Sequence, residues 1–326
     1  MALDLSGFKP FEPSDYSFFF DRLHSYKRRY PRFYESFSRY LHQPHVFWWG
    51  MVDDHLCILK RSQIMGNPVC YLMLPPIGPN PRSVMEIFQW EKISTMLSEE
   101  DIEILGLSEH EVVVDKGNAE YCYRLDAFSD RYGVNKNQLR QPVNQALRMQ
   151  ESGQIDIRVL STYIPPAVLE SAVDLTMRWK QQRDKKAYKP TFFLHQFSQL
   201  AIKKPSNHVS VFIMEGERCL GYLITELTPN GIINNVACTD YEDNPLRNTT
   251  LVLLHTAATK WIENGISEST IVNRGAAVRG AGSKVAKEKL RPVCAHQNYK
   301  LKIDGKLSKA EYDALWSSPK DDLEWL

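Results

Sequence analysis

The chain has 326 residues, about twice the usual length of one domain, and 43% of them are hydrophobic against 24% charged. These values are typical of a globular protein with a buried core, and they exclude disordered, collagen-like and fibrous chains. Forty basic residues against thirty-nine acidic ones give a net charge of +1, so only a local patch would serve to bind nucleic acid or a membrane.

No targeting or membrane segment is visible. Asp4, Lys9, Glu12 and Asp15 interrupt the region where a secretory signal needs apolar residues, and the longest apolar stretch, residues 46–52, is far shorter than the roughly 20 residues of a membrane span. We expect a soluble, cytoplasmic protein without transmembrane contact. The cysteines form no Cys-x-x-Cys pair, which favours reduced thiols; they are Cys57, Cys70, Cys122, Cys219, Cys238 and Cys294.

The N-terminal part begins with two expected helices. Ser14 is a candidate N-cap of the first, and Pro31 a candidate first residue of the second. Short β-rich runs separated by turn residues then predict an antiparallel meander of three strands, His45–Gly50, His55–Lys60 and Pro68–Leu74. A helix from about Pro81 to Leu97 and a short strand, Ile102–Leu105, are predicted to follow.

The same order returns from Val209 onward. A second meander is predicted with the strands Val209–Glu215, Cys219–Leu227 and Gly231–Thr239. The polar loop 240–248 leads into a helix from about Thr249 to Glu263, which Asn264-Gly265 ends, and the strand Ser269–Val272 comes next.

Each half also adds a basic helix and one more strand. In the first half these are Asn137–Met149 and Ile155–Leu160, and in the second Gly282–Leu290 and Gln297–Ile303. This is the element order of a GNAT-type N-acyltransferase unit. We therefore predict an α+β protein of two tandem GNAT-like domains, 1–160 and 161–326, each a mixed, mostly antiparallel sheet flanked by helices, with the functional cleft in the second. An unrelated α+β fold of the same length is the alternative.

A basic segment stands out between Arg274 and Arg291, with six basic residues and one acid. It joins a strand end at Asn273, a glycine-containing loop, and a helix bearing Lys284 and Lys287. Small residues let a ligand approach the backbone, helix-start N–H groups attract phosphate, and Arg and Lys bind phosphate or carboxylate. The segment thus indicates an anion site; a solvated helix face is the alternative.

The loop before the helix at Thr249 is a second candidate site. Arg247, Asn248 and Thr249 stand at a helix N-terminus, which suits an anion such as a coenzyme A pyrophosphate. The glycines of the usual GNAT pyrophosphate loop are absent, so helix capping alone is the alternative.

Other candidates rest on single residues. Glu226, Asp240 and His255 flank the expected cleft as possible bases, and Tyr299 is a possible acid for a leaving group; a core role is the alternative for each. The basic helix end 179–186 is a further possible contact for nucleic acid or a polar head group, or simply a helix terminus with favourable charges. The histidines show no metal-binding spacing, so no metal is expected.

The sequence around Asn273 resembles the phosphatidylglycerol lysyltransferase C-terminal-domain family (DUF2156), whose members are tandem GNAT folds. The resemblance covers most of the chain, including Trp49, and is specific over 270–301. The matching stretches are Val272-Asn273-Arg274-Gly275, Gly280, Ala286-Lys287, Arg291-Pro292 and Asn298-Tyr299-Lys300-Leu301, with Glu120–Leu125, Gly133 and the basic segment 136–144 upstream.

This resemblance implies an acyltransferase or aminoacyltransferase. An amine or hydroxyl would attack a carbonyl from acyl-coenzyme A or aminoacyl-tRNA, with no covalently bound cofactor. Arg274, Lys284 and Lys287 would hold phosphates, with Arg247 at the helix start, and Asn273 would orient the reacting group. At the two positions after Asn-Arg where the family has acidic residues, this chain has Gly275 and Ala277, which implies a different acceptor or lost activity.

Two alternatives stay open at this stage. One is a non-catalytic GNAT-like module that binds tRNA, other nucleic acid or a phosphorylated partner with the same basic groove. The other is an acyltransferase whose acceptor is a modified nucleic-acid base. The acceptor is thus a small molecule, a peptide or a nucleic acid.

Overall fold

The computed structural model describes residues 7–42, 46–64, 67–89, 96–114, 119–129, 136–182, 190–203, 205–240, 244–246, 248–276 and 281–301. The chain forms two compact units. Unit 1 comprises Met1–Arg29, Arg39–Ala119 and His296–Leu326, and unit 2 comprises Tyr30–Ser38 and Glu120–Ala295. The predicted boundary at residue 160 falls inside unit 2, because β8 (Asp156–Leu160) pairs along its length with β9 (His208–Glu215).

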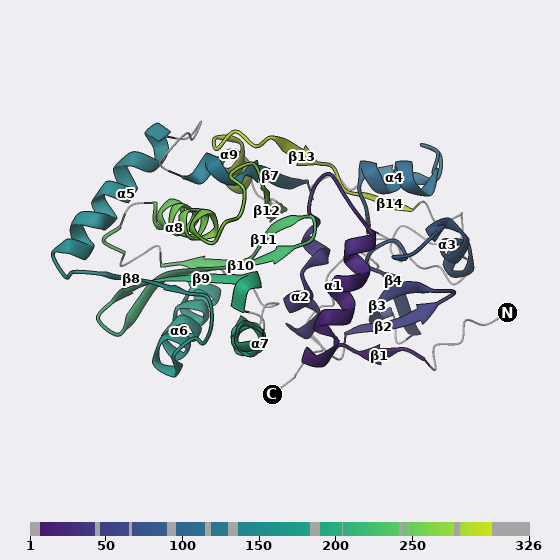
Figure 1. The fold of residues 1–326 in the computed structure, drawn as a ribbon, viewed down its shortest axis with the longest axis horizontal. Coiled ribbons are helices and arrows are strands. Elements are labelled where there is room, and N and C mark those ends of the chain that lie inside the picture. Colours follow the sequence, from purple (N-terminus) through teal and green to yellow (C-terminus); the bar gives the residue numbers. More distant parts are fainter. Residues whose placement is uncertain are drawn as a thin grey trace. The chain divides into compact units, whose positions relative to one another are not determined.

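Unit 1 contains the first predicted meander. The strands β1 (Lys9–Pro10), β2 (Phe47–Val52), β3 (His55–Ile64) and β4 (Asn67–Leu72) form an antiparallel sheet in that order (Figure 1). A smaller sheet has the order β5-β14-β6, from Met96–Leu97, Tyr299–Leu301 and Val112–Val114. The helices of this unit include α1 (Tyr16–Ser25), α3 (Pro81–Gln89) and α4 (Glu99–Leu105).

The strand predicted at Ile102–Leu105 is wrong, because these residues belong to α4. Ser98 caps this helix: its side chain accepts from the Asp101 backbone N–H, and the Asp101 carboxylate accepts from the Ser98 N–H in return. Gly106 ends the helix with a φ of 59°, a conformation that costs glycine little. Local capping therefore overrides the β-branched composition of the segment.

The two N-terminal helices exist but begin later than predicted. Ser14 lies in the 3-10 turn η1 (Pro13–Asp15), and α1 starts at Tyr16. Pro31 starts no helix: residues Phe33–Glu35 form the turn η2, and α2 (Phe37–His42) follows.

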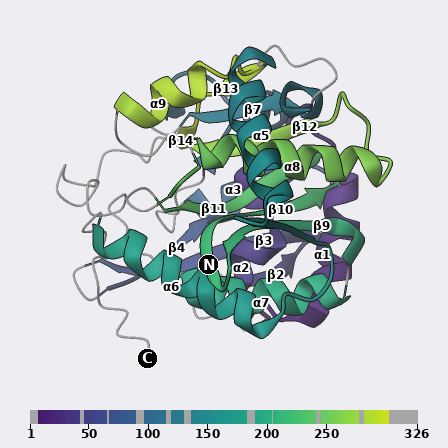
Figure 2. The same cartoon turned by 90° about the vertical axis from the view of Figure 1, so that its left-hand side faces the viewer.

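Unit 2 is built on a seven-stranded sheet of order β13-β7-β12-β11-β10-β9-β8. Its further strands are β7 (Glu120–Arg124), β10 (Arg218–Thr228), β11 (Gly231–Thr239), β12 (Ile271–Ala276) and β13 (Cys294–His296). In Figures 1 and 2, α5 (Lys136–Glu151) and α8 (Thr249–Glu263) cover one face, and α6 (Pro166–Gln182) and α7 (Pro190–Lys203) the other. The short helix α9 (Ala281–Glu288) follows β12, and the turns η3 (Leu125–Phe128) and η4 (Pro205–Asn207) complete the unit.

The predicted α+β class, with sheets flanked by helices, is confirmed. The second meander and α8 match the predicted positions, since alternating apolar residues face α6 and α8 from opposite sides of the sheet. The strand predicted at Gln297–Ile303 begins later, as β14 from Tyr299, and residues 302 and 303 lie outside the described residues. Among the described residues, no helix combines the length and the apolar content needed to cross a bilayer.

Candidate functional site

The site lies in unit 2, where two neighbouring strands stop pairing. In the described residues, β11 and β12 pair in parallel at Ile232↔Val272 and Ile233↔Asn273. The register of β11 against β10 shifts directly after this point, so that Asn235 is an extra residue without an opposite partner. A parallel pair that ends early, next to a bulge, leaves part of the β11 edge open to a ligand.

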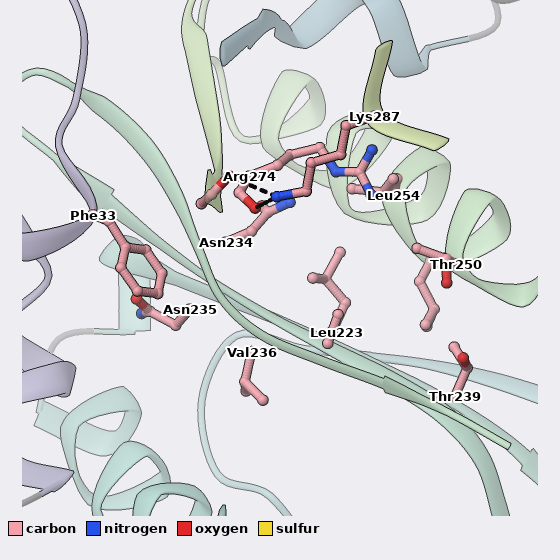
Figure 3. Close-up of a pocket in the computed structure, with 13 residues that line it drawn as sticks. Phe33, Leu223, Asn234, Asn235, Val236, Thr239, Thr250, Leu254, Arg274 and Lys287 are labelled. Atoms are coloured by element: carbon pink, nitrogen blue, oxygen red, sulfur yellow. Dashed lines mark hydrogen bonds between the residues drawn. The ribbon is translucent and has the colours of Figure 1, made fainter. Parts of the chain in front are cut away.

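A cavity of about 380 Å³ lies at this position. Figure 3 shows Leu223 on one side of it, Asn234, Arg274 and Lys287 opposite, and Phe33 and Thr250 toward different ends. The lining residues that the structure describes are Phe33, Leu223, Asn234, Asn235, Val236, Ala237, Thr239, Thr250, Leu253, Leu254, Arg274, Gly275 and Lys287. The volume suits a small organic group.

Arg274 contributes a half-buried cation to the pocket. Its guanidinium carbon lies 5.5 Å from the ring centroid of Tyr123 and 5.8 Å from that of Phe128, so the aromatic faces support it. Its Nη1 is buried and finds no hydrogen-bond partner in the described part of the chain. A bound ligand that offers an acceptor would satisfy this donor.

Lys287 contributes the second cation and holds the end of β12. Its Nζ donates to the Arg274 carbonyl at 2.9 Å and to the Gly275 carbonyl at 2.6 Å. Burial and, to a smaller extent, the nearby guanidinium of Arg274 lower the pKa of Lys287 from 10.5 to about 7, while Glu120 and Cys122 oppose the shift. The amine thus titrates near neutral pH at the wall of the pocket.

Asn273, predicted to orient the reacting group, is completely buried. Its Nδ2 donates to the Pro31 carbonyl at 2.7 Å and to Glu120 Oε2 at 2.5 Å, and its Oδ1 accepts from the Gly275 N–H at 2.6 Å. These bonds set the backbone of Gly275, whose φ is 69°. The side chain therefore positions the strand end beside the pocket.

The segment Tyr30–Ser38 belongs to unit 2 and brings Phe33 to the pocket. Buried Glu120 accepts from the Phe33 N–H at 3.0 Å and lies 3.6 Å from the guanidinium of buried Arg32. The Phe33 ring lies 3.4 Å from where a Cβ on Gly275 would stand. Phe33 is thus held against β12 as one wall of the pocket.

Glu226, a predicted base, is also completely buried. It accepts hydrogen bonds from the Phe37 N–H at 3.2 Å and from three side chains, those of Ser36, Ser38 and Asn235, at 2.6, 2.8 and 2.9 Å. Because a carboxylate only accepts, it fixes the Asn235 amide with Nδ2 toward Glu226. The Oδ1 of Asn235 is buried without a hydrogen-bond partner among the described residues.

The start of α8 reaches the same pocket through Thr250. Asn248 precedes the helix with a φ of 56° and makes no capping bond, while Thr249 is buried and its hydroxyl donates to the Leu246 carbonyl at 3.1 Å. Arg247 lies outside the described residues, as does the side chain of Lys284.

The other predicted residues lie apart from the pocket lining. Asp240 is ion-paired with Arg218 at 2.7 Å, and His255 Nδ1 donates to the Phe128 carbonyl at 2.8 Å. Tyr299 belongs to unit 1, where its hydroxyl donates to Glu99 at 3.3 Å. The basic helix end at 183–186 lies outside the described residues; Trp179 before it packs against the core beneath α6.

The sequence interpretation missed the amide and apolar part of the lining. Asn234 and Asn235 stand together in an otherwise apolar strand, and such a pair of neighbouring amides was a usable signal. Phe33 carries no local signal, because about two hundred residues separate it from the strands that it touches.

The fold is shared with proteins of known structure. A conserved protein of unknown function from Bacteroides thetaiotaomicron matches with a TM-score of 0.68 at 15% identity, over 90% of this chain and 99% of that one. The DUF2156 domain at the C-terminus of a candidate lysylphosphatidylglycerol synthetase from Agrobacterium fabrum matches with a TM-score of 0.62 at 11% identity, over 92% and 95%. A GNAT-family acetyltransferase from Colwellia psychrerythraea matches with a TM-score of 0.53 at 11% identity, over 91% and 99%.

These likenesses confirm the predicted GNAT-like fold and its resemblance in structure to the DUF2156 domain. By sequence, no family model and no curated protein matches the chain. At identities of 11 to 15%, the likeness concerns the fold alone.

Proposed function

We propose that unit 2 transfers an acyl or aminoacyl group from an activated donor, acyl-coenzyme A or aminoacyl-tRNA, to an amine or hydroxyl. The observation that carries the proposal is the place where the described pairing of β11 with β12 ends and a bulge and a cavity coincide. The fold shared with a GNAT-family acetyltransferase supports the same class of reaction.

The donor would bind along the pocket from the start of α8. Helix-start N–H groups near Asn248 and Thr250 attract phosphate, and we retain Arg247 and Lys284 as proposed phosphate ligands. The carbonyl of the acyl group would lie at the β11 edge, where backbone N–H groups are suited to stabilise the oxyanion of a tetrahedral intermediate. Arg274 and Lys287 add positive charge beside it.

The acceptor amine would meet the asparagine oxygens. The Oδ1 atoms of Asn234 and Asn235 are buried without hydrogen-bond partners in the described residues, so each can accept an N–H from the nucleophile. The amine then attacks the carbonyl carbon, the bond to the thiol sulfur or ribose oxygen breaks, and the leaving group takes up the proton that the amine loses. Orientation supplies much of the rate in such a reaction.

In this proposal the buried polar residues position the others. Glu226 orients Asn235, and Asn273 with Lys287 sets the end of β12. Neither Glu226 nor Asn273 lines the pocket. The role of Tyr299 as an acid is a hypothesis that rests on the sequence alone.

Substitution of Arg274 tests the proposal. Arg274→Ala should greatly weaken donor binding and transfer, because it removes a cation of the lining, whereas Arg158→Ala, at a partly exposed arginine in β8, should change neither. Native mass spectrometry of the purified protein identifies a co-purifying coenzyme A or tRNA. Donor affinity and turnover that survive Arg274→Ala would refute the assignment of this pocket.

A second candidate is a binding module without catalysis. Its support is that Asn273 and Glu226 are both committed to internal hydrogen bonds, and that Gly275 stands where the resembling family has an acid. Such a module would bind tRNA, another nucleic acid or a phosphorylated ligand through the basic groove. Steep salt dependence of tRNA affinity, with no transfer from either donor class, favours the module.

A further inference from the structure

The charges around the pocket indicate which kind of acyl group it accepts. This inference rests on the proposed transferase function. We propose that the pocket selects an acyl group that ends in an anion, such as a carboxylate, and rejects acyl groups that carry an ammonium. The preferred donor is then a carboxylated acyl thioester, and an aminoacyl ester is disfavoured.

The lining itself is positively charged. Two of its thirteen described residues, Arg274 and Lys287, are basic and none is acidic; the others are amides, hydroxyls, small residues and apolar side chains. An ammonium bound among them would be a third cation in a partly desolvated space, where like charges repel far more strongly than in water. The lining residues that the structure describes therefore offer a cationic acyl group no ionic partner.

The pKa of Lys287 already reflects its burial next to a second positive charge. Burial and the neighbouring guanidinium of Arg274 both lower its pKa. A ligand anion would oppose both causes, because it would pair with the ammonium and screen it from Arg274. A ligand cation would add to them.

Arg274 supplies a specific contact for the anion. Its Nη1 is buried and lacks a hydrogen-bond partner in the described residues, so a carboxylate oxygen of the ligand could accept a hydrogen bond from it. Charge-assisted bonds of this kind are among the strongest that proteins make with small anions. The aromatic rings of Tyr123 and Phe128 hold the guanidinium in place from behind.

The nearby carboxylates do not provide a cation site in the lining. Glu120 is engaged by the guanidinium of Arg32, by Asn273 and by the Phe33 N–H. Glu226 accepts from four donors in the described part of the chain, and one of these, the neutral amide of Asn235, belongs to the pocket lining. Both are completely or almost completely buried behind the lining residues.

Position 275 adds no charge to the lining. Gly275 has a φ of 69°, and the Phe33 ring lies 3.4 Å from where a Cβ would stand. A side chain at this position would be strained and would contact the ring. The part of the pocket nearest to Phe33 is therefore an apolar wall.

Three coenzyme A thioesters test the proposal with little change in shape. Succinyl-, butyryl- and β-alanyl-coenzyme A share the chain CO–CH₂–CH₂–X, and X is a carboxylate, a methyl group or an ammonium. We expect calorimetry at pH 6.5 to show succinyl-coenzyme A binding at least tenfold more tightly than β-alanyl-coenzyme A, with butyryl-coenzyme A between them. A succinyl to β-alanyl ratio below tenfold would overturn the proposal.

Variants of Arg274 locate the cause of the preference. Arg274→Gln should reduce the succinyl to β-alanyl ratio at least threefold, Arg274→Lys should preserve it, and Arg158→Gln at the partly exposed β8 arginine should leave it unchanged. Unchanged thermal unfolding of each variant confirms that it is folded. A ratio that persists in folded Arg274→Gln would overturn the role assigned to this side chain.

A transfer assay separates this inference from the proposed function. Transfer from aminoacyl-tRNA, combined with no binding of any of the three thioesters, would overturn the charge selection and leave the transferase standing. Tight, charge-selective binding of the thioesters with no transfer to any amine would support the selection and remove the transferase.

Discussion

Replacing Lys287 by Met is expected to change how the stability of unit 2 depends on pH. The pKa of Lys287 is lowered to about 7 in the folded protein from an ordinary value of 10.5. Between these values the unfolded chain binds the proton more tightly than the folded one does, so the free energy of unfolding rises with pH. Methionine keeps the unbranched length of the side chain and removes the titration.

The size of the effect follows from the two pKa values. Each full pH unit between them contributes about 1.4 kcal/mol, so from pH 6 to pH 8.5 the wild-type protein should gain about 2 kcal/mol relative to Lys287→Met. The measurement is urea unfolding of both proteins at the two pH values, followed by tryptophan fluorescence. Lys289→Met, at an exposed lysine of the same segment, should show the wild-type dependence.

The outcome distinguishes two states of the buried amine. If the free energy of unfolding rises more steeply with pH in the wild type than in Lys287→Met, the pKa of Lys287 lies near 7 in the folded protein. If the difference in the free energy of unfolding between the two proteins stays constant from pH 6 to pH 8.5, this reasoning is refuted, since folding would then leave the proton affinity of Lys287 unchanged.

The remaining predictions concern buried contacts. Glu226→Gln should lower the free energy of unfolding by about 2–4 kcal/mol, because it sets an N–H against buried donors. The turnover of the folded variant should stay within about tenfold of the wild-type value, and a total loss of turnover in folded protein would instead make Glu226 the base. Gly275→Ala should cost about 1–2 kcal/mol for its φ of 69°, and equal stability in urea would contradict the strained backbone. In unit 1, Asp101→Asn should cost about 3–5 kcal/mol by calorimetry, because it breaks a completely buried ion pair with Arg28; a loss below about 1 kcal/mol would contradict that.

Local patterns in the sequence were sufficient for most of unit 2. Apolar alternation and turn residues placed β9, β10 and β11, and Asn264-Gly265 marked the end of α8, because these signals act between residues close in the chain. The same reasoning failed at α4, where a capping box at Ser98 and Asp101 outweighs the apolar residues Ile102 and Ile104.

The candidate site was only partly visible in the sequence. Arg274 and Lys287 were found because they belong to one short basic segment, and both line the pocket. The roles of Asn273 and Glu226 were harder to judge, because the same polar residue type serves catalysis or internal hydrogen bonding according to what surrounds it. Their burial and bonding partners are properties of the folded chain.

By itself, the sequence determined the class of fold, the order of the elements and the position of the basic segment, because all three depend on neighbours within a few turns of chain. Only the tertiary structure decided that Phe33 joins unit 2, that the described pairing of β11 with β12 ends at Ile233, and that the described lining residues include no acid. These features need contacts between residues up to about 240 positions apart, and the near-zero net charge of the chain gave no indication of a pocket with two cations.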